Sequence, residues 1–251
     1  MQLDLTGKNA LVTGSSRGIG RAIAEALHRE GCCVVINGRS LTDLTRTAAA
    51  LPGTVTVAGD VTIPDDARRV VAEAIAALGG LDILVCNVGS GLSVPPGDES
   101  YAEWQRVFAT NLWSATNVIE AARESLAATR GAIACISSIC GLETIPGAPV
   151  TYSVAKAALN AYVRGIARPL GRLGVRINAV APGNILFEGS AWEQRLSENP
   201  LDVGAMLQRD VALARFGDPR TIADIAAYLV SPRANFVTGT VWAADGGQVH
   251  S

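Results

Sequence analysis

The stretch N-A-L-V-T-G-S-S-R-G-I-G, at residues 9–20, joins an apolar run to a glycine-rich turn and to the start of a segment with helical spacing. The apolar run at 9–13 predicts a buried strand, and the apolar spacing at 18–30 predicts a helix. Glycines allow a tight turn between these two elements. We therefore expect a strand, a turn and a helix whose free N-terminal N–H groups face the turn.

The same alternation continues along the chain of 251 residues. Further runs of strand length lie at 33–37, 54–58, 83–86, 132–137, 176–181 and 241–243, and segments with helical spacing lie at 41–51, 65–78, 101–128, 151–173 and 221–230. This succession predicts a Rossmann-like, doubly wound α/β fold, in which helices cover both faces of a parallel sheet of about seven strands.

We expect one domain over residues 1–251, because no Pro-, Gly- or Ser-rich linker, internal repeat or low-complexity tract divides the chain. The stretch N-I-L-F-E-G-S-A-W-E-Q-R-L-S-E-N-P, which begins at Asn184, breaks the alternation. We interpret residues 184–215 as an insertion that forms a lid over a substrate.

Composition excludes several functional classes. Hydrophobic residues make up 49% of the chain and charged residues 18%, and the net charge of −2 gives no general attraction to nucleic acid or to anionic membranes. No apolar run approaches the length of about 18 residues that spans a bilayer. The N-terminus M-Q-L-D-L-T-G-K lacks the pattern of a signal peptide. We expect a soluble, cytoplasmic protein without nucleic-acid or membrane partners.

The chain has five cysteines and two histidines. Most of the cysteines lie in apolar runs, so buried free thiols in a reducing compartment explain them best. There is no C-x-x-C spacing, and we expect no metal site. Ser138 lies in S-S-I-C-G rather than in G-x-S-x-G, so the pattern gives no support for a serine hydrolase.

The glycine turn predicts a nucleotide site. Its backbone allows close approach of a ligand, and the helix N-terminus offers N–H groups and a positive dipole end to a diphosphate. A dinucleotide fits this arrangement. The residues that we expect to contact it here are Gly14, Ser16, Arg17, Gly18, Ile19 and Gly20.

The end of the second predicted strand bears on the choice of dinucleotide. The sequence there is N-G-R-S, at 37–40, and it lacks the carboxylate that would bind the adenosine ribose hydroxyls of NAD. Arg39, with Ser40 beside it and Arg17 in the turn, suits charge-assisted bonds to a 2′-phosphate. We expect NADP(H) to be preferred, with NAD(H) possible. The alternative is that Arg39 only opens a solvated helix.

Tyr152 and Lys156, in T-Y-S-V-A-K at 151–156, lie one helical turn apart. A free tyrosine keeps its proton up to a pH of about 10, and a nearby positive charge favours the phenolate. Lys156 could supply that charge. The same spacing also occurs on solvated helix faces, so the pair alone leaves both interpretations open.

Several motifs occur in one order along the chain: T-G-S-S-R-G-I-G from Thr13, Asp60-Val61, C-N-V-G from Cys86, Asn111, Ser138, Y-S-V-A-K from Tyr152, and Pro182-Gly183. Together they resemble the single-domain branch of the short-chain dehydrogenase/reductase family, and in particular its 3-oxoacyl-[acyl-carrier-protein] reductase-like members. The resemblance covers residues 5–247. It implies an oxidoreductase that interconverts a ketone and a secondary alcohol with NADP(H), and a homo-oligomer, either tetramer or dimer.

The resemblance also assigns roles to four residues. Tyr152 would be the general acid in carbonyl reduction, or the general base in alcohol oxidation. Lys156 would hold the nicotinamide ribose and lower the pKa of Tyr152. Ser138, with Ser137 as the competing candidate, would orient the substrate oxygen. Asn111, at the kink of the helical segment 101–128, would hold a water that links Lys156 to solvent.

Further cofactor contacts follow from the resemblance. Asp60 and Val61 would border the adenine, Asn87 and Gly89 would line the cofactor after the fourth strand, and Pro182, Gly183 and Ile185 would flank the nicotinamide. Phe187 stands where the family usually has a threonine that contacts the nicotinamide amide.

We expect the substrate pocket to be bounded by 89–94, 142–149 and 184–215. These stretches carry Leu92, Val94, Ile145, Leu186, Phe187, Trp192 and Met206, with few positive charges except Arg195 and Arg209. A mostly apolar pocket suits a small carbonyl or alcohol substrate, such as a β-ketoacyl thioester or a sugar-derived ketone. The alternatives are an NAD-dependent alcohol dehydrogenase of the same family and a non-catalytic nucleotide-binding protein.

Overall fold

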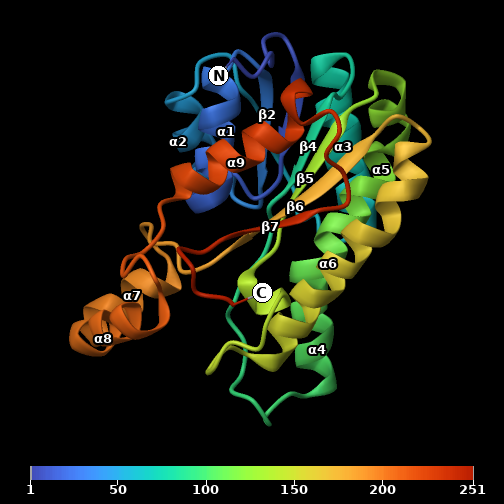
Figure 1. The fold of residues 1–251 in the computed structure, drawn as a ribbon. Helices are drawn as coiled ribbons and strands as arrows, with labels where there is room; N and C mark the ends of the chain where they lie inside the picture. Colours follow the sequence, from blue (N-terminus) through green and yellow to red (C-terminus); the bar gives the residue numbers. More distant parts are fainter. Residues whose placement is uncertain (1, 251) are drawn as a thin grey trace.

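The computed structural model describes residues 2–250, whose strands form one seven-stranded sheet (Figure 1). The strands are β1 (Asn9–Val12), β2 (Cys33–Gly38), β3 (Val55–Ala58), β4 (Ile83–Cys86), β5 (Ala132–Ile136), β6 (Arg176–Pro182) and β7 (Val241–Ala244). Every neighbouring pair is parallel, in the order β3-β2-β1-β4-β5-β6-β7. The predicted Rossmann-like, doubly wound α/β fold is confirmed.

Helices connect the strands. They are α1 (Gly18–Arg29), α2 (Leu41–Ala49), α3 (Pro64–Leu78), α4 (Tyr101–Phe108), α5 (Ser114–Thr129), α6 (Val150–Gly171), α7 (Ala191–Glu198), α8 (Pro200–Asp210) and α9 (Pro219–Val230), with the short turns η1 (Ala109–Trp113), η2 (Ile139–Gly141) and η3 (Pro232–Ala234). Within residues 2–250, none of the helices combines the length and the apolar character needed to cross a bilayer.

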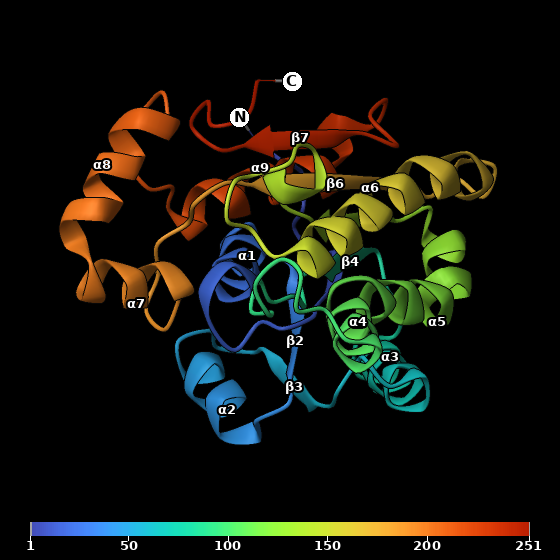
Figure 2. The ribbon, with the colours of Figure 1, turned by 90° about the horizontal axis from the view of Figure 1, so that it is seen from below.

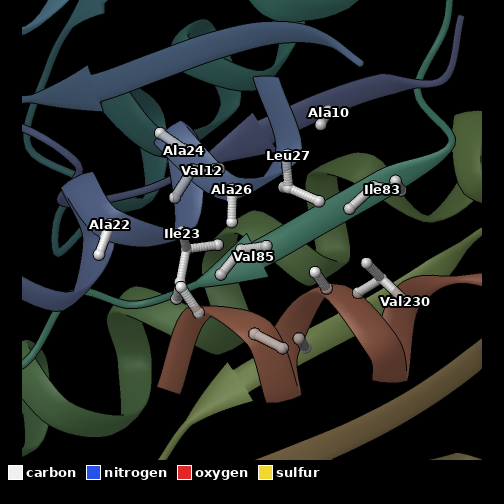
Figure 3. Close-up of a cluster of buried hydrophobic side chains, with 14 of the residues drawn as sticks. Ala10, Val12, Ala22, Ile23, Ala24, Ala26, Leu27, Ile83, Val85 and Val230 are labelled. Carbon is white, nitrogen blue, oxygen red and sulfur yellow. The ribbon is translucent and has the colours of Figure 1, made fainter. Parts of the chain in front are cut away.

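The core consists of two layers, one on each face of the sheet. Successive strand residues point to opposite faces, so Ala10 and Val12 belong to the cluster under α1 and α9, while Leu11 belongs to the cluster under α3, α5 and α6. In Figure 3, side chains of α1 such as Ile23 gather with Val85 of β4 and Val230 of α9. Because helices cover both faces of the central strands, these strands are mostly apolar, as in I-L-V-C of β4.

The strand order places the loops of the glycine turn and of the other motifs together. β1 lies between β2 and β4: the chain runs from β1 outward through β2 to β3, then crosses back past β1 to β4 and builds the other half of the sheet. Ligands of doubly wound sheets bind outside the carboxyl ends of the strands at such a switch point. The loops after β1, β4, β5 and β6, which carry the predicted motifs, all leave from this edge.

The segment 184–215 contains two helices that the sequence pattern did not predict. α7 and α8 lie away from the sheet, on the side of α1 opposite α5 (Figures 1 and 2). Their apolar side chains form a small separate cluster around Val203 and Leu207, with Phe216 packed against it. Ser190 caps α7 by accepting a hydrogen bond from the N–H of Glu193 at 3.1 Å.

Candidate active site

The glycine turn is shaped by its contacts with the ends of β2 and β4. Ser15 N donates to the Asn37 carbonyl oxygen at 2.8 Å, and Asn87 Nδ2 donates to the Gly14 carbonyl oxygen at 2.9 Å. Gly14 and Gly18 have φ values of +61° and +56°, which side chains disfavour. A Cβ on Gly20 would collide with the Asn87 amide. These positions therefore require glycine.

The N-terminus of α1 has no side-chain cap. Arg17 occupies the N-cap position with an extended backbone, and its side chain makes no capping hydrogen bond. The first N–H groups of a helix lack partners within the helix. Here they face the turn between β1 and α1, so the residues present fit a bound diphosphate.

The residues predicted at the adenosine end lie at the ends of β2 and β3, outside the lining of the main cleft. Ser40 caps α2 by accepting from the Asp43 N–H at 3.3 Å, and Arg39 is exposed. Asp60 accepts hydrogen bonds from the N–H and hydroxyl of Thr62, at 3.0 and 2.7 Å, and Val61 is buried. Asp60 and Ser40 thus already have structural partners. The hydroxyl of Ser16 lies close to Gly38, since a Cβ there would be 3.5 Å from Oγ.

Tyr152 and Ser138 meet where α6 begins and β5 ends. Both line the cleft. Desolvation raises the pKa of Tyr152 to about 12, and the neighbouring Ser138 hydroxyl only partly opposes this shift. The Tyr152 phenol is therefore protonated across the neutral range and is suited to donate a proton.

Lys156 lies behind the Tyr152 ring. Its Nζ atom is 5.9 Å from the ring centre and donates to the Ile136 carbonyl oxygen at 2.8 Å. The side chain is 2% exposed, and burial lowers its pKa to about 8. In this structure desolvation of the phenol is the largest influence on the pKa of Tyr152, and the Lys156 ammonium is bound to a backbone carbonyl. The expected lowering of the Tyr152 pKa by Lys156 stays a prediction.

The two neighbouring serines have different surroundings. Ser137 Oγ donates to Asn160 Oδ1 at 2.6 Å within the buried contact between β5 and α6. Ser138 Oγ accepts from the Cys140 N–H at 3.2 Å and lines the cleft beside Tyr152. Both serines line the cleft, but the Ser137 hydroxyl proton is bound to Asn160, whereas Ser138 only accepts from a backbone N–H, so Ser138 is the better placed to donate to a ligand.

Asn111 lies in the π-helical turn η1 and is buried behind the cleft. Its Oδ1 accepts from Ser90 N at 2.9 Å, and its Nδ2 donates to the carbonyl oxygens of Ser90 and Val107, both at 3.0 Å. A Cβ on Gly89 would lie 3.0 Å from both Asn111 Oδ1 and Lys156 Nζ. Asn111 thus fixes the loop after β4 next to Lys156, and Gly89 leaves room for both side chains.

The cleft continues past the end of β6. Gly183 N donates to the Ala244 carbonyl oxygen at 3.1 Å, and a Cβ on Gly183 would be 2.7 Å from Asp245. Ile185 forms an isolated bridge with Gly217. Gln248 also lines the cleft, and its Oε1 is buried without a hydrogen-bond partner among residues 2–250. The sequence patterns missed Gln248, because only the pairing of β7 with β6 brings it here.

All these loops enclose a cleft of about 1370 Å³. Pockets for a single small ligand measure about 300–1,000 Å³, so there is room for a dinucleotide and a second molecule. Of the predicted site residues, the lining includes Gly14, Arg17, Gly18, Ile19, Gly20, Asn87, Gly89, Ser138, Tyr152, Lys156, Pro182, Gly183 and Ile185.

The substrate end of the cleft is more polar than we expected. Leu92, Ile145, Phe187, Trp192 and Met206 line it as predicted, whereas Val94 and Leu186 do not. Carboxylates also line it, from Glu143, Glu198, Asp202 and Asp210, beside Arg195 and Arg209. The pattern missed Glu198, Asp202 and Asp210 because it placed no helices in 184–215, and α7 and α8 turn these three side chains toward the cleft. Glu143 lies in the loop at 142–149.

A family model described as enoyl-(acyl carrier protein) reductase matches residues 14–249. The chain belongs to the short-chain dehydrogenase/reductase family. A ketoacyl reductase named for the granaticin polyketide synthase of Streptomyces violaceoruber is 37% identical, over 95% of this chain and 94% of that protein. Glucose 1-dehydrogenase of Gluconobacter oxydans is 34% identical, over 96% and 91% of the two chains. The predicted family and enzyme class, an oxidoreductase, are confirmed.

Solved structures agree with this assignment. L-sorbose reductase from Gluconobacter frateurii, in complex with NADPH and L-sorbose, superposes over the whole of both chains with a TM-score of 0.93 and 29% identity.

Proposed function

We propose that this short-chain dehydrogenase/reductase interconverts a ketone and a secondary alcohol with NADP(H). The observation that carries the proposal is that Ser138, Tyr152 and Lys156 line the same cleft as the uncapped N-terminus of α1. A proton donor beside a dinucleotide site is what carbonyl reduction needs.

The chain's own residues perform the proton chemistry. Ser138 donates a hydrogen bond to the substrate oxygen and orients it, and Tyr152 transfers its hydroxyl proton to that oxygen during reduction. Lys156, held by the Ile136 carbonyl, keeps a positive charge next to the phenolate that forms. When bound, the nicotinamide supplies or accepts the hydride. The water-holding role of Asn111 stays a prediction.

The preference for NADP(H) rests on Arg39 and Arg17. Arg39 is exposed at the end of β2, and the stretch 37–40 carries no carboxylate that would oppose a 2′-phosphate. The related L-sorbose reductase was solved with NADPH. An NAD-dependent dehydrogenase of the same family is the alternative.

We infer that the substrate is a hydroxylated ketone. Glu198 and Asp202 at the mouth of the cleft can accept hydrogen bonds from hydroxyl groups, and the Gln248 amide lies deeper in the cleft. Two relatives are named for sugars, glucose and sorbose. A β-ketoacyl thioester is the competing substrate, suggested by the ketoacyl reductase relative.

Three further expectations accompany the proposal. Residues 184–215 would act as a lid on a single domain, the protein would form a tetramer or dimer of identical chains, and it would be cytoplasmic.

NADPH absorbance measured against a panel of ketones tests the proposal. The panel should contain hydroxylated ketones, plain ketones and a β-ketoacyl thioester, each also with NADH. We expect oxidation of NADPH with at least one hydroxylated ketone. Absence of turnover with every compound would contradict the proposed function.

A further inference from the structure

The loop at 90–94 forms the wall of the cleft beside Tyr152. Gly91 and Leu92 line the cleft, and a Cβ on Gly91 would be 3.9 Å from the Tyr152 ring. The position of this loop therefore decides how much room a substrate has next to the phenol.

A partly buried carboxylate holds this loop. Glu103 of α4 accepts a hydrogen bond from Ser93 Oγ at 2.7 Å. Arg106, one turn further along α4, donates to Glu103 at 2.8 Å and to the Leu92 carbonyl oxygen at 2.9 Å. Two consecutive loop residues, Leu92 and Ser93, are thus bound to one Glu–Arg pair.

The same network reaches α6. Ser93 Oγ lies 2.6 Å from the hydroxyl of Thr151, which is fully buried and immediately precedes Tyr152. Pro149 at the N-cap of α6 makes no side-chain capping bond. The contact between Thr151 and Ser93 instead holds the first turn of α6 from outside the helix.

The directions of the hydrogen bonds follow from the charges. The Glu103 side chain is 14% exposed, and its bonds to Arg106 and Ser93 lower its pKa to about 2, so it is ionised and can only accept. Ser93 has one hydroxyl proton and gives it to Glu103. Thr151 must then donate to Ser93, which orders the chain Thr151, Ser93, Glu103.

We propose that Glu103, Ser93 and Thr151 are positioning residues that fix Tyr152 against the substrate loop. This inference rests on the proposed function. None of the three touches the reacting atoms; they act through the backbone that carries Tyr152. Displacing a catalytic side chain by about 1 Å can lower the reaction rate about 100-fold. The network therefore affects the rate of the reaction as well as the stability of the fold.

The test compares Thr151→Val, which keeps the shape of the side chain and removes its hydroxyl, with Thr151→Ser, which keeps the hydroxyl. Thr129→Val is the matched control, because it removes a hydroxyl that donates to the Leu81 carbonyl oxygen at 2.8 Å, far from the cleft. For ketone reduction we expect kcat to fall roughly 10- to 100-fold in Thr151→Val and Ser93→Ala. We expect Thr151→Ser to remain near wild type, and the NADPH Kd to stay within about twofold.

A second measurement does not need turnover. Hydrogen exchange read by mass spectrometry should accelerate at both 90–94 and 150–153 in Thr151→Val, and at neither segment in Thr129→Val. The proposal is overturned if Thr151→Val keeps its kcat, if Thr151→Ser fails to restore it, or if the two segments exchange independently. A wild-type protein that reduces no ketone would instead contradict the proposed function, and the exchange comparison would still decide whether Thr151 restrains the loop.

Discussion

The ring of Phe187 lies against Gly18, so that a Cβ on Gly18 would come within 2.6 Å of Phe187 Cε2. Phe187 also packs against the core cluster under α1, and Arg17 reaches toward the same loop at Gly189. A side chain from the predicted lid thus lies on the glycine turn where a diphosphate would approach. Phe187, which stands in place of the family's usual threonine, therefore affects the approach of a diphosphate to the glycine turn.

Phe187→Thr should bind NADPH faster than the wild type. The smaller side chain leaves the glycine turn open, so no ring has to move before the diphosphate reaches the N–H groups of α1. We expect the association rate constant to rise about three- to tenfold, measured by stopped-flow fluorescence of NADPH. Phe236→Thr is the control, because Phe236 is fully exposed at a distance from the cleft. An unchanged association rate in Phe187→Thr would show that the ring is no obstacle.

Tyr152→Phe should abolish ketone reduction and leave the cofactor bound. Removing a general acid typically costs about 10²–10⁴-fold in kcat. The ring that packs near Lys156 stays in place, so the NADPH Kd from fluorescence titration should change by no more than about twofold. Tyr101→Phe, at an exposed position on α4, controls for loss of a tyrosine hydroxyl. Residual turnover above a tenth of wild type would remove Tyr152 from the proposed role.

Arg39→Asp should shift the preference from NADPH toward NADH. A charge-assisted hydrogen bond contributes about 1.5–3 kcal/mol, so kcat/KM for NADPH should fall about 10- to 100-fold. The new carboxylate can accept hydrogen bonds from the ribose hydroxyls of NADH. Arg46→Asp makes the same charge change on α2, where Arg46 pairs with Asp43. Equal losses for both cofactors would contradict the assignment of Arg39 to the 2′-phosphate.

The strands were predictable from the sequence because helices cover both faces of the sheet. Their residues are apolar without alternation, as in I-L-V-C of β4, and glycine or polar residues bound them. The order of the motifs along the chain then predicted which loops meet. Ser138 and Tyr152 were assigned to one site in this way, and the structure brings them together.

What the sequence could not reveal depends on contacts between distant residues. The kink expected at Asn111 in the segment 101–128 is the π-helical turn η1, but its cause is visible only in the structure: Asn111 Nδ2 bonds the Val107 carbonyl oxygen and competes with the backbone ladder. Ser93 and Thr151 come together only through the fold. The start of α7 did leave a local signal, since Ser190 and Glu193 have capping-box spacing.

The pKa values of Lys156 and Tyr152 predict how the free energy of unfolding changes in alkaline solution. Lys156 titrates at about 8 when folded and at 10.5 when unfolded, so between these pH values the unfolded chain binds more protons. Stability then rises with pH through this window. Tyr152 titrates at about 12 when folded and 10.0 when unfolded, so its contribution falls above pH 10.

Lys156→Met isolates the lysine contribution, because methionine fills the same apolar channel without a titrating group. Relative to this variant, the wild type should gain up to about 3 kcal/mol of unfolding free energy between pH 8 and 10.5, from urea titrations at several pH values. Lys8→Met is the matched control, since Lys8 is a partly exposed lysine paired with Asp82. Parallel pH profiles for the wild type and Lys156→Met would mean that Lys156 keeps its ordinary pKa in the folded protein. Burial behind Tyr152 would then not lower the pKa of Lys156.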